Sequence, residues 1–221
     1  MFLGHYAVAF AAKKIAPKTS LGTLFLSAQF LDLLWPLFLL LGLEHVRIDP
    51  GNTAFTPLDF YDYPLSHSLV TVLGWAVVLG AIYFFRRKDK TGAWILGLGV
   101  TSHWLLDFIT HRPDLPIAPG LQTYVGLGLW NSVAATIFVE SALFIFAMVL
   151  YIRATQARDR VGLYAFWAFV AFSAFIYVGN VMSRHQPPPN EMVLAVGGLS
   201  QWLIIPWAYW IDRHHVFKSV S

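Results

Sequence analysis

The sequence predicts an all-α, polytopic membrane protein with about six transmembrane helices and a short N-terminal helix. The chain of 221 residues is 57% hydrophobic and only 12% charged, and its mean hydropathy is +0.59. This composition is typical of membrane proteins and not of soluble domains. The apolar residues are also gathered into runs of about 20 residues, the length that one helix needs to cross a bilayer.

Runs of this length recur along the whole chain. They lie near residues 20–43, 66–85, 92–110, 128–152, 161–183 and 191–211. A further helix over residues 2–16 is shorter, and its charges follow its apolar residues, which is the reverse of a cleaved secretory signal. No long linker and no internal repeat separates these segments. We therefore expect a single integral membrane domain over residues 1–221, with its polar motifs in 1–115 and accessory helices in 128–211.

Basic residues lie in the short loops between the runs and predict the orientation of the chain. They form four groups: Lys13, Lys14 and Lys18; Arg86, Arg87, Lys88 and Lys90; Arg153, Arg158 and Arg160; Arg213 and Lys218. Because short cationic loops stay on the cytoplasmic side, we expect a multi-pass protein of the inner (cytoplasmic) membrane. Loops 86–91 and 153–160 and the C-terminus are then cytoplasmic, and the loops at 44–65, 111–127 and 184–190 face outward. The net charge of +3 is therefore explained by orientation in the bilayer, and we expect no nucleic-acid partner.

Ionisable side chains are costly in hydrocarbon, so those within the runs are candidates for a functional site. The candidates are Asp32, His103, Asp107 and Glu140 within runs, and His5, His67 and His111 near predicted outer ends. For Asp32 or Glu140 alone, a hydrogen bond between helices is an equally good interpretation. The grouping of several candidates in the outer half favours a site.

The segment SHWLLDFITHRP places His103, Asp107 and His111 four residues apart. Residues with this spacing share a helix face and lie about 6 Å apart along the axis. His103 and Asp107 can therefore hold one ion together. His111 lies about 12 Å from His103 along the axis, which is too far for both to bind that ion directly. Either Asp107 bridges two metals, or His111 lies at the mouth of the site.

Other candidates are predicted at a similar depth. In PLSHSLV, Ser66 is expected to cap the span that follows, which puts His67 in its first turn. His5 reaches the outer half if helix 2–16 crosses with Met1 outside. Asp32 precedes Pro36, which cannot donate to the carbonyl of residue 32 and so predicts a locally opened helix. Glu140, with no cation at its depth, is expected to be protonated, metal-bound or facing water.

The residue types of this set suit a metal site. The chain has no cysteine, which excludes disulfides and thiolate ligands. Imidazole and carboxylate ligands suit Zn²⁺ and leave a position for water. We expect one to three divalent ions, with Asp107 as a catalytic carboxylate that bridges two ions if two are present. Glu140 or a non-ligating aspartate is expected to act as general base, and Ser66 and Ser68 to contact substrate.

The order of these motifs also resembles a known family. GHYAVAFAAKK, FLDLLWP, LSHSLV and SHWLLD together resemble the YdjM-like inner-membrane metal-dependent hydrolases, over roughly residues 1–115. That family is grouped by resemblance with the zinc-dependent phospholipase C superfamily, whose helical proteins hold zinc with His and Asp. The resemblance implies the ligands His5, Asp32, His67, His103 and Asp107. It gives no counterpart for His111 or Glu140.

The function we expect is hydrolysis of a lipid-like or amphiphilic ester, most simply a phosphoester, through a metal-activated water. The alternative is an ion or proton-coupled transporter or channel that uses the buried His, Asp and Glu side chains. A transport path needs polar groups in both halves of the membrane, whereas these candidates gather toward one side. A scaffold that binds metal only for stability is the third interpretation.

Overall fold

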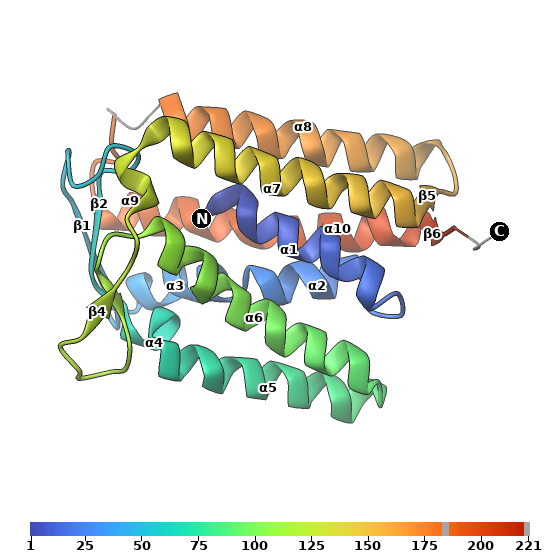
Figure 1. Cartoon of the computed structure of the whole chain (residues 1–221), viewed down its shortest axis with the longest axis horizontal. Helices are drawn as coiled ribbons and strands as arrows, with labels where there is room; N and C mark the ends of the chain where they lie inside the picture. The colour runs from blue at the N-terminus through green and yellow to red at the C-terminus, as the bar shows by residue number, and fades with distance from the viewer. Residues whose placement is uncertain (183–185, 219–221) are drawn as a thin grey trace.

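Long apolar helices lie side by side along the molecule in the computed structural model, which describes residues 1–182 and 186–218 (Figure 1). The α-helices are α1 (Phe2–Ile15), α2 (Leu21–Ala28), α3 (Phe30–Leu40), α4 (Pro64–His67), α5 (Leu69–Arg87), α6 (Lys90–Thr110), α7 (Val133–Ala154), α8 (Arg160–Met182), α9 (Glu191–Leu199) and α10 (Ile204–Arg213). Within these residues, five helical segments are long and apolar enough to cross a membrane, or six if α2 and α3 form one broken span. The prediction of a mostly helical chain with several helices apolar enough to cross a membrane is confirmed.

Short strands in the connections depart from the all-α prediction. They form three antiparallel pairs: β1 (His45–Ile48) with β2 (Leu58–Asp62), β3 (Leu115–Pro116) with β4 (Tyr124–Val125), and β5 (Thr155–Ala157) with β6 (His215–Phe217). Two 3₁₀ turns, η1 (Leu129–Asn131) and η3 (Ser200–Leu203), complete the described elements. In these pairs, backbone N–H and C=O groups of the connecting segments form hydrogen bonds with one another. The first residues of the predicted loop 184–190 lie outside the described part.

Helix α1 lies at the centre of the bundle, where it packs mainly against α7, α2 and α6. Its 14 residues span about 21 Å, which is shorter than the bilayer core. Tyr6 and Phe10 are fully buried, and the Phe10 ring contacts the rings of Phe25, Phe144 and Phe169. The N-terminal helix is therefore a core element, which carries His5 into the interior.

The predicted span over residues 20–43 is broken into α2 and α3, which meet at an angle of 57°. The break lies at Gln29, whereas Pro36 lies inside α3, where it has no N–H to donate to the carbonyl of Asp32. Ala28 is the last residue of α2, and its carbonyl belongs to those that a helix end leaves without an intrahelical partner. Asp32 lies in the first turn of α3, where the helix dipole favours a carboxylate.

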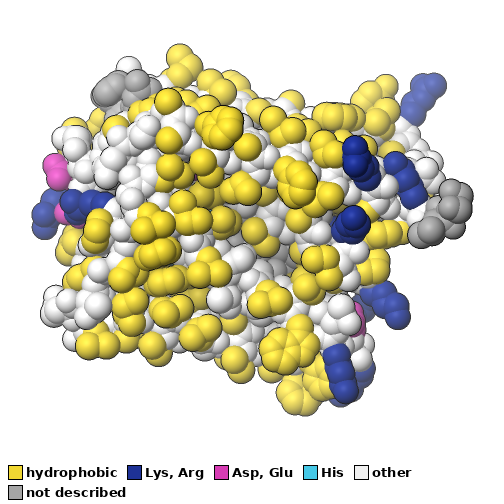
Figure 2. Space-filling view, in the orientation of Figure 1, with side chains coloured by type: hydrophobic (Ala, Val, Ile, Leu, Met, Phe, Trp, Pro, Cys, Tyr) yellow, Lys and Arg dark blue, Asp and Glu magenta, His cyan; other side chains and the backbone are white. Residues whose placement is uncertain are grey.

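The four basic groups lie at one end of the bundle. The α1–α2, α5–α6 and α7–α8 connections and the chain end all come to this end in Figure 1. Figure 2 shows Lys and Arg gathered there, with a broad apolar band over the middle of the same face. This arrangement is the one that the loop charges predict. The side of the membrane on which each end lies stays a prediction.

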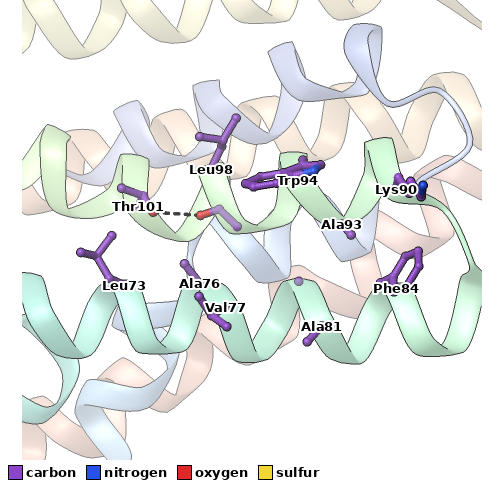
Figure 3. Close-up of a pocket in the computed structure, with 12 residues that line it drawn as sticks. Leu73, Ala76, Val77, Ala81, Phe84, Lys90, Ala93, Trp94, Leu98 and Thr101 are labelled. Atoms are coloured by element: carbon purple, nitrogen blue, oxygen red, sulfur yellow. Dashed lines mark hydrogen bonds between the residues drawn. The ribbon is translucent and has the colours of Figure 1, made fainter.

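Helices α5 and α6 pack closely through small residues and leave an apolar groove on their outer face (Figure 3). A side chain at Gly80 would bring a Cβ within 3.0 Å of the Ala93 carbonyl, which explains why a glycine suits this crossing. The groove, about 510 Å³ in volume, is lined by Leu73, Val77, Trp94 and other apolar residues. Its composition suits contact with hydrocarbon.

Candidate metal centre

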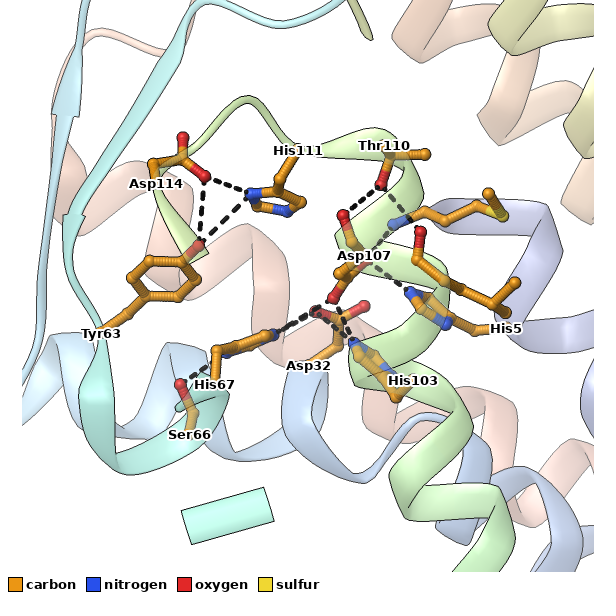
Figure 4. A network of polar contacts seen from close by, with 12 residues as sticks. His5, Asp32, Tyr63, Ser66, His67, His103, Asp107, Thr110, His111 and Asp114 are labelled. Atoms are coloured by element: carbon orange, nitrogen blue, oxygen red, sulfur yellow. Dashed lines mark hydrogen bonds and ion pairs between the residues drawn. The ribbon is translucent and has the colours of Figure 1, made fainter. Parts of the chain in front are cut away.

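Five predicted residues meet in the half of the bundle opposite the basic end (Figure 4). They are His5 from α1, Asp32 from α3, His67 from α4, and His103 and Asp107 from α6. They form two triads whose ligand atoms lie within 4.8 Å of one another: His5, His103 and Asp107, and Asp32, His67 and His103. All are buried except Asp32, whose side chain is 26% exposed. Asp32 therefore marks the side on which the cluster is open to solvent.

The spacing of the side-chain atoms fits a bound cation. Asp107 Oδ2 lies 3.2 Å from His103 Nε2 and 3.7 Å from His67 Nε2. Asp32 Oδ1 lies 3.5 and 3.7 Å from the same two nitrogens. Charge-assisted hydrogen bonds are shorter, about 2.7–2.9 Å. Ligand atoms about 2.1 Å from a tetrahedral ion lie roughly 3.4 Å from one another, which is the spacing found here.

The hydrogen bonds of His103 direct a lone pair toward the carboxylates. Its Nδ1 lies 2.7 Å from the carbonyl oxygen of Ala28, and a carbonyl can only accept, so Nδ1 carries the proton. Nε2 is buried and has no hydrogen-bond partner among the described residues. With the proton on Nδ1, a neutral His103 would have its lone pair on Nε2, facing Asp32 and Asp107, and a cation between them would stabilise that form. A backbone carbonyl on the other ring nitrogen is also the usual support for a metal-binding histidine.

A buried carboxylate that the sequence did not predict orients His67. Glu44 is fully buried; its Oε1 accepts the N–H groups of Leu65 and Ser66, each at 2.7 Å. The Ser66 hydroxyl donates to Glu44 Oε2 at 2.6 Å and lies 2.7 Å from His67 Nδ1. With its proton given to Glu44, Ser66 Oγ can only accept from His67 Nδ1–H. In a neutral His67, Nε2 would therefore also carry a lone pair that faces the carboxylates.

Glu44 was missed because it follows the apolar run in a loop, where a carboxylate is usually solvated. Burial raises the pKa of Glu44, and the hydrogen bonds from Ser66 and Leu65 oppose that rise by stabilising the charged form. These three donors are the reason that a carboxylate is retained at this buried position.

His5 completes the cluster from the other side. Its Nε2 lies 3.2 Å from Asp107 Oδ1, and its ring stacks on His103 with centroids 3.5 Å apart. Two imidazolium rings would repel at this distance, so the stack requires that at least one ring is neutral. Asp107 Oδ1 also accepts from the Met1 amino group at 2.5 Å. The two oxygens of Asp107 thus face different histidines, as a bridging carboxylate would.

The serines beside His67 differ from the prediction. Ser68, and not Ser66, caps α5 by accepting from Thr71 N–H, and His67 ends the short helix α4 instead of lying in the first turn of the span. Both serines are fully buried. Their contact with substrate stays a prediction, and both hydroxyls already have protein partners.

Glu140 and His111 lie outside both triads. Glu140 Oε2 accepts the N–H of Leu3 at 2.7 Å, so this carboxylate holds the start of α1, where the helix dipole favours it. His111 Nδ1 lies 3.0 Å from Asp114 Oδ1, and its ring packs 4.3 Å from that of Trp130. Glu140, predicted as a general base, thus holds the start of α1 instead. His111, predicted as a possible ligand of a second metal, pairs with Asp114 instead.

Comparisons of the chain with protein-family models, curated proteins and solved structures give no match. The geometry of the His/Asp cluster is therefore the basis on which a function can be inferred.

Proposed function

We propose that the protein is a membrane-embedded metal-dependent hydrolase that cleaves a lipid-like or amphiphilic phosphoester, with Zn²⁺ held by His5, Asp32, His67, His103 and Asp107. The observation that carries the proposal is the convergence of two carboxylates with the Nε2 atoms of His67 and His103. The hydrogen bonds at Nδ1 leave Nε2 of each neutral histidine with a lone pair for a metal ion. A cation at this point would neutralise the two carboxylates, whose other possible partners are protonated histidines and the Met1 ammonium group.

When bound, Zn²⁺ supplies an acidified water and a positive charge beside the ester, because zinc lowers the pKa of a coordinated water to about 7. The protein side chains orient this chemistry. Asp107 uses both oxygens within the cluster, and the part-exposed Asp32 would hold the ion on the side that is open to a substrate. The buried histidines keep water away from the other sides.

The surroundings support an amphiphilic substrate. Asp32, His103 and Asp107 lie on helices that are apolar enough to cross a membrane, so a substrate reaching them is itself at the bilayer. The resemblance of the motifs in residues 1–115 to YdjM-like hydrolases favours a phosphoester.

The transporter alternative is less well supported by the interior of the bundle. A second buried ion pair, Lys13 with Asp212 at 2.8 Å, lies near the basic end. Between it and the cluster, Phe10 is enclosed by the rings of Phe25, Phe144 and Phe169. This apolar layer interrupts the polar path that ion or proton movement needs.

Metal analysis of the purified protein tests the proposed site. We expect stoichiometric metal in the wild type, with strong loss in His103→Gln and in the isosteric variant Asp107→Asn. His214→Ala, a histidine at the basic end, is the matched control and should keep its metal. Full metal content in both cluster variants would refute the site and leave His103 as an imidazolium paired with carboxylates.

The reaction is tested separately with a panel of phospholipids in detergent micelles. Release of phosphate or headgroup by the metal-loaded wild type, and its absence in His67→Ala, would support the hydrolase. Ion flux in proteoliposomes, together with no product from any lipid, would replace it by the transporter.

A further inference from the structure

A hollow lined by polar and apolar residues lies at the basic end of the bundle, away from the His/Asp cluster. It has a volume of about 550 Å³ and lies between the α1–α2 connection, α2, the end of α5 and α10. Leu26, Leu79 and Leu96 line the part toward the middle of the bundle, whereas Arg86 and Arg87, in the last turn of α5, line the part toward its end. The hollow is therefore apolar on its membrane side and cationic on its outer side.

The cations of this hollow outnumber its carboxylates. Of the lining residues that the structure describes, Lys13, Lys18, Arg86 and Arg87 are cations and Asp212 is the one carboxylate, a formal balance of four minus one, or +3. Asp212 is already used, because its Oδ1 pairs with Lys13 Nζ at 2.8 Å. Within residues 1–182 and 186–218, the side chains of Lys18, Arg86 and Arg87, which line the hollow, make no hydrogen bond or ion pair. Three cations are thus available to a ligand.

Hydroxyl groups add further donors. Thr23 Oγ1 lies 2.7 Å from Ser20 Oγ and 2.7 Å from Tyr209 OH. Three hydroxyl protons serve these two hydrogen bonds, so in every arrangement one proton is left for another acceptor. The wall of the hollow is therefore rich in donors, and a group that only accepts, such as a phosphate, complements it.

We propose that this hollow binds an anionic phospholipid, with the phosphate held by Arg86, Arg87 and Lys18 and an acyl chain against Leu26 and Leu79. Basic pockets between transmembrane helices at a membrane surface bind such headgroups. A free phosphate would satisfy the donors but leave the apolar wall uncovered, which is why a lipid fits better than a small anion. This site does not depend on the proposed hydrolysis.

Titration of the detergent-solubilised full chain with phosphatidylglycerol, followed by native mass spectrometry, tests the proposal. Each surface cation contributes about 1 kcal/mol to anionic-lipid binding, so Arg86→Gln/Arg87→Gln should bind roughly 30-fold more weakly. Arg153→Gln/Arg160→Gln is the matched control, because it makes the same charge change at the same end but outside the lining. We expect its affinity to equal that of the wild type, and phosphatidylcholine to bind much more weakly.

Three results would overturn the proposal. Wild-type affinity in Arg86→Gln/Arg87→Gln would show that these side chains do not hold the lipid. Equal weakening in the control would show attraction by the overall charge of this end. Full displacement of phosphatidylglycerol by millimolar inorganic phosphate would show a small-anion site. Circular dichroism of both variants establishes that they fold, which is expected because the four arginines are exposed.

Discussion

Replacing Glu44 by Gln tests the hydrogen-bond chain that orients His67. The change keeps the size of the side chain and the oxygen that accepts from Leu65 and Ser66. It places an NH₂ group where Oε2 now accepts the Ser66 hydroxyl. Ser66 must then accept from Gln and donate to His67 Nδ1, which moves the ring proton to Nε2. The nitrogen that faces Asp32 and Asp107 would no longer be a ligand.

The size of the effect follows from the bond that is reversed. A hydrogen bond to a charged group contributes about 1.5–3 kcal/mol, and each 1.4 kcal/mol is about a factor of ten in affinity. We expect Glu44→Gln to weaken metal binding roughly 10- to 100-fold, within the range found for residues that support metal ligands. Ser66→Ala should act in the same direction, and the double variant should lose little more, because both changes break one chain.

A chelator-competition titration of the detergent-solubilised protein measures this affinity, and ¹⁵N NMR reports the His67 tautomer. Glu191→Gln is the matched control, because Glu191 also accepts a backbone N–H, that of Val46, at 3.2 Å but has no link to His67. Wild-type affinity and an unchanged tautomer in a folded Glu44→Gln variant would refute the reasoning.

Three further changes have defined outcomes. Gly99→Ala should lower the free energy of unfolding by about 1–3 kcal/mol, because the added Cβ would overlap Ser27 of α2. Gly74→Ala, with open space around the added Cβ, is the control and should not lower it. Equal melting temperatures of the two variants would contradict the predicted overlap. His111→Ala should keep its full metal content, and a proportional loss of metal would make His111 a ligand. The pKa of Asp159 is lowered by an N–H in the first turn of α8 and by His214. The stabilising effect of the Asp159 carboxylate is therefore present above the ordinary aspartate pKa and lost as pH falls. If the melting temperature of Asp159→Asn falls with acidification just as that of the wild type does, Asp159 makes no such contribution.

The sequence predicted the His/Asp set well because helix spacing is a local property. His103 and Asp107 are four residues apart on one helix, and that spacing alone brings them to one face. Asp32, His5 and His67 were predicted from the cost of polar groups in apolar runs and from the motif resemblance. All three have side-chain atoms within the two triads.

The rest of the site depends on contacts that no local pattern encodes. The Ala28 carbonyl reaches His103 only because the chain breaks at Gln29, and no proline or glycine marks that break. Glu44 looks like an ordinary loop carboxylate until the fold buries it under Ser66. The central place of α1 was equally hidden, since its short length indicates a peripheral segment, and only its packing against α7 shows otherwise.

The central position of α1 has a consequence for how the protein is made. His5 and Asp107 are 102 residues apart in the chain, and Leu3 and Glu140 are 137 apart. Helix α1 therefore meets two of its main partners only after α6 and α7 have been synthesised, although α2 follows it directly. Until then His5 has no cluster to join, and such long-range pairing is slow. The final place of α1 is thus settled only after segments more than 100 residues further along the chain have been made.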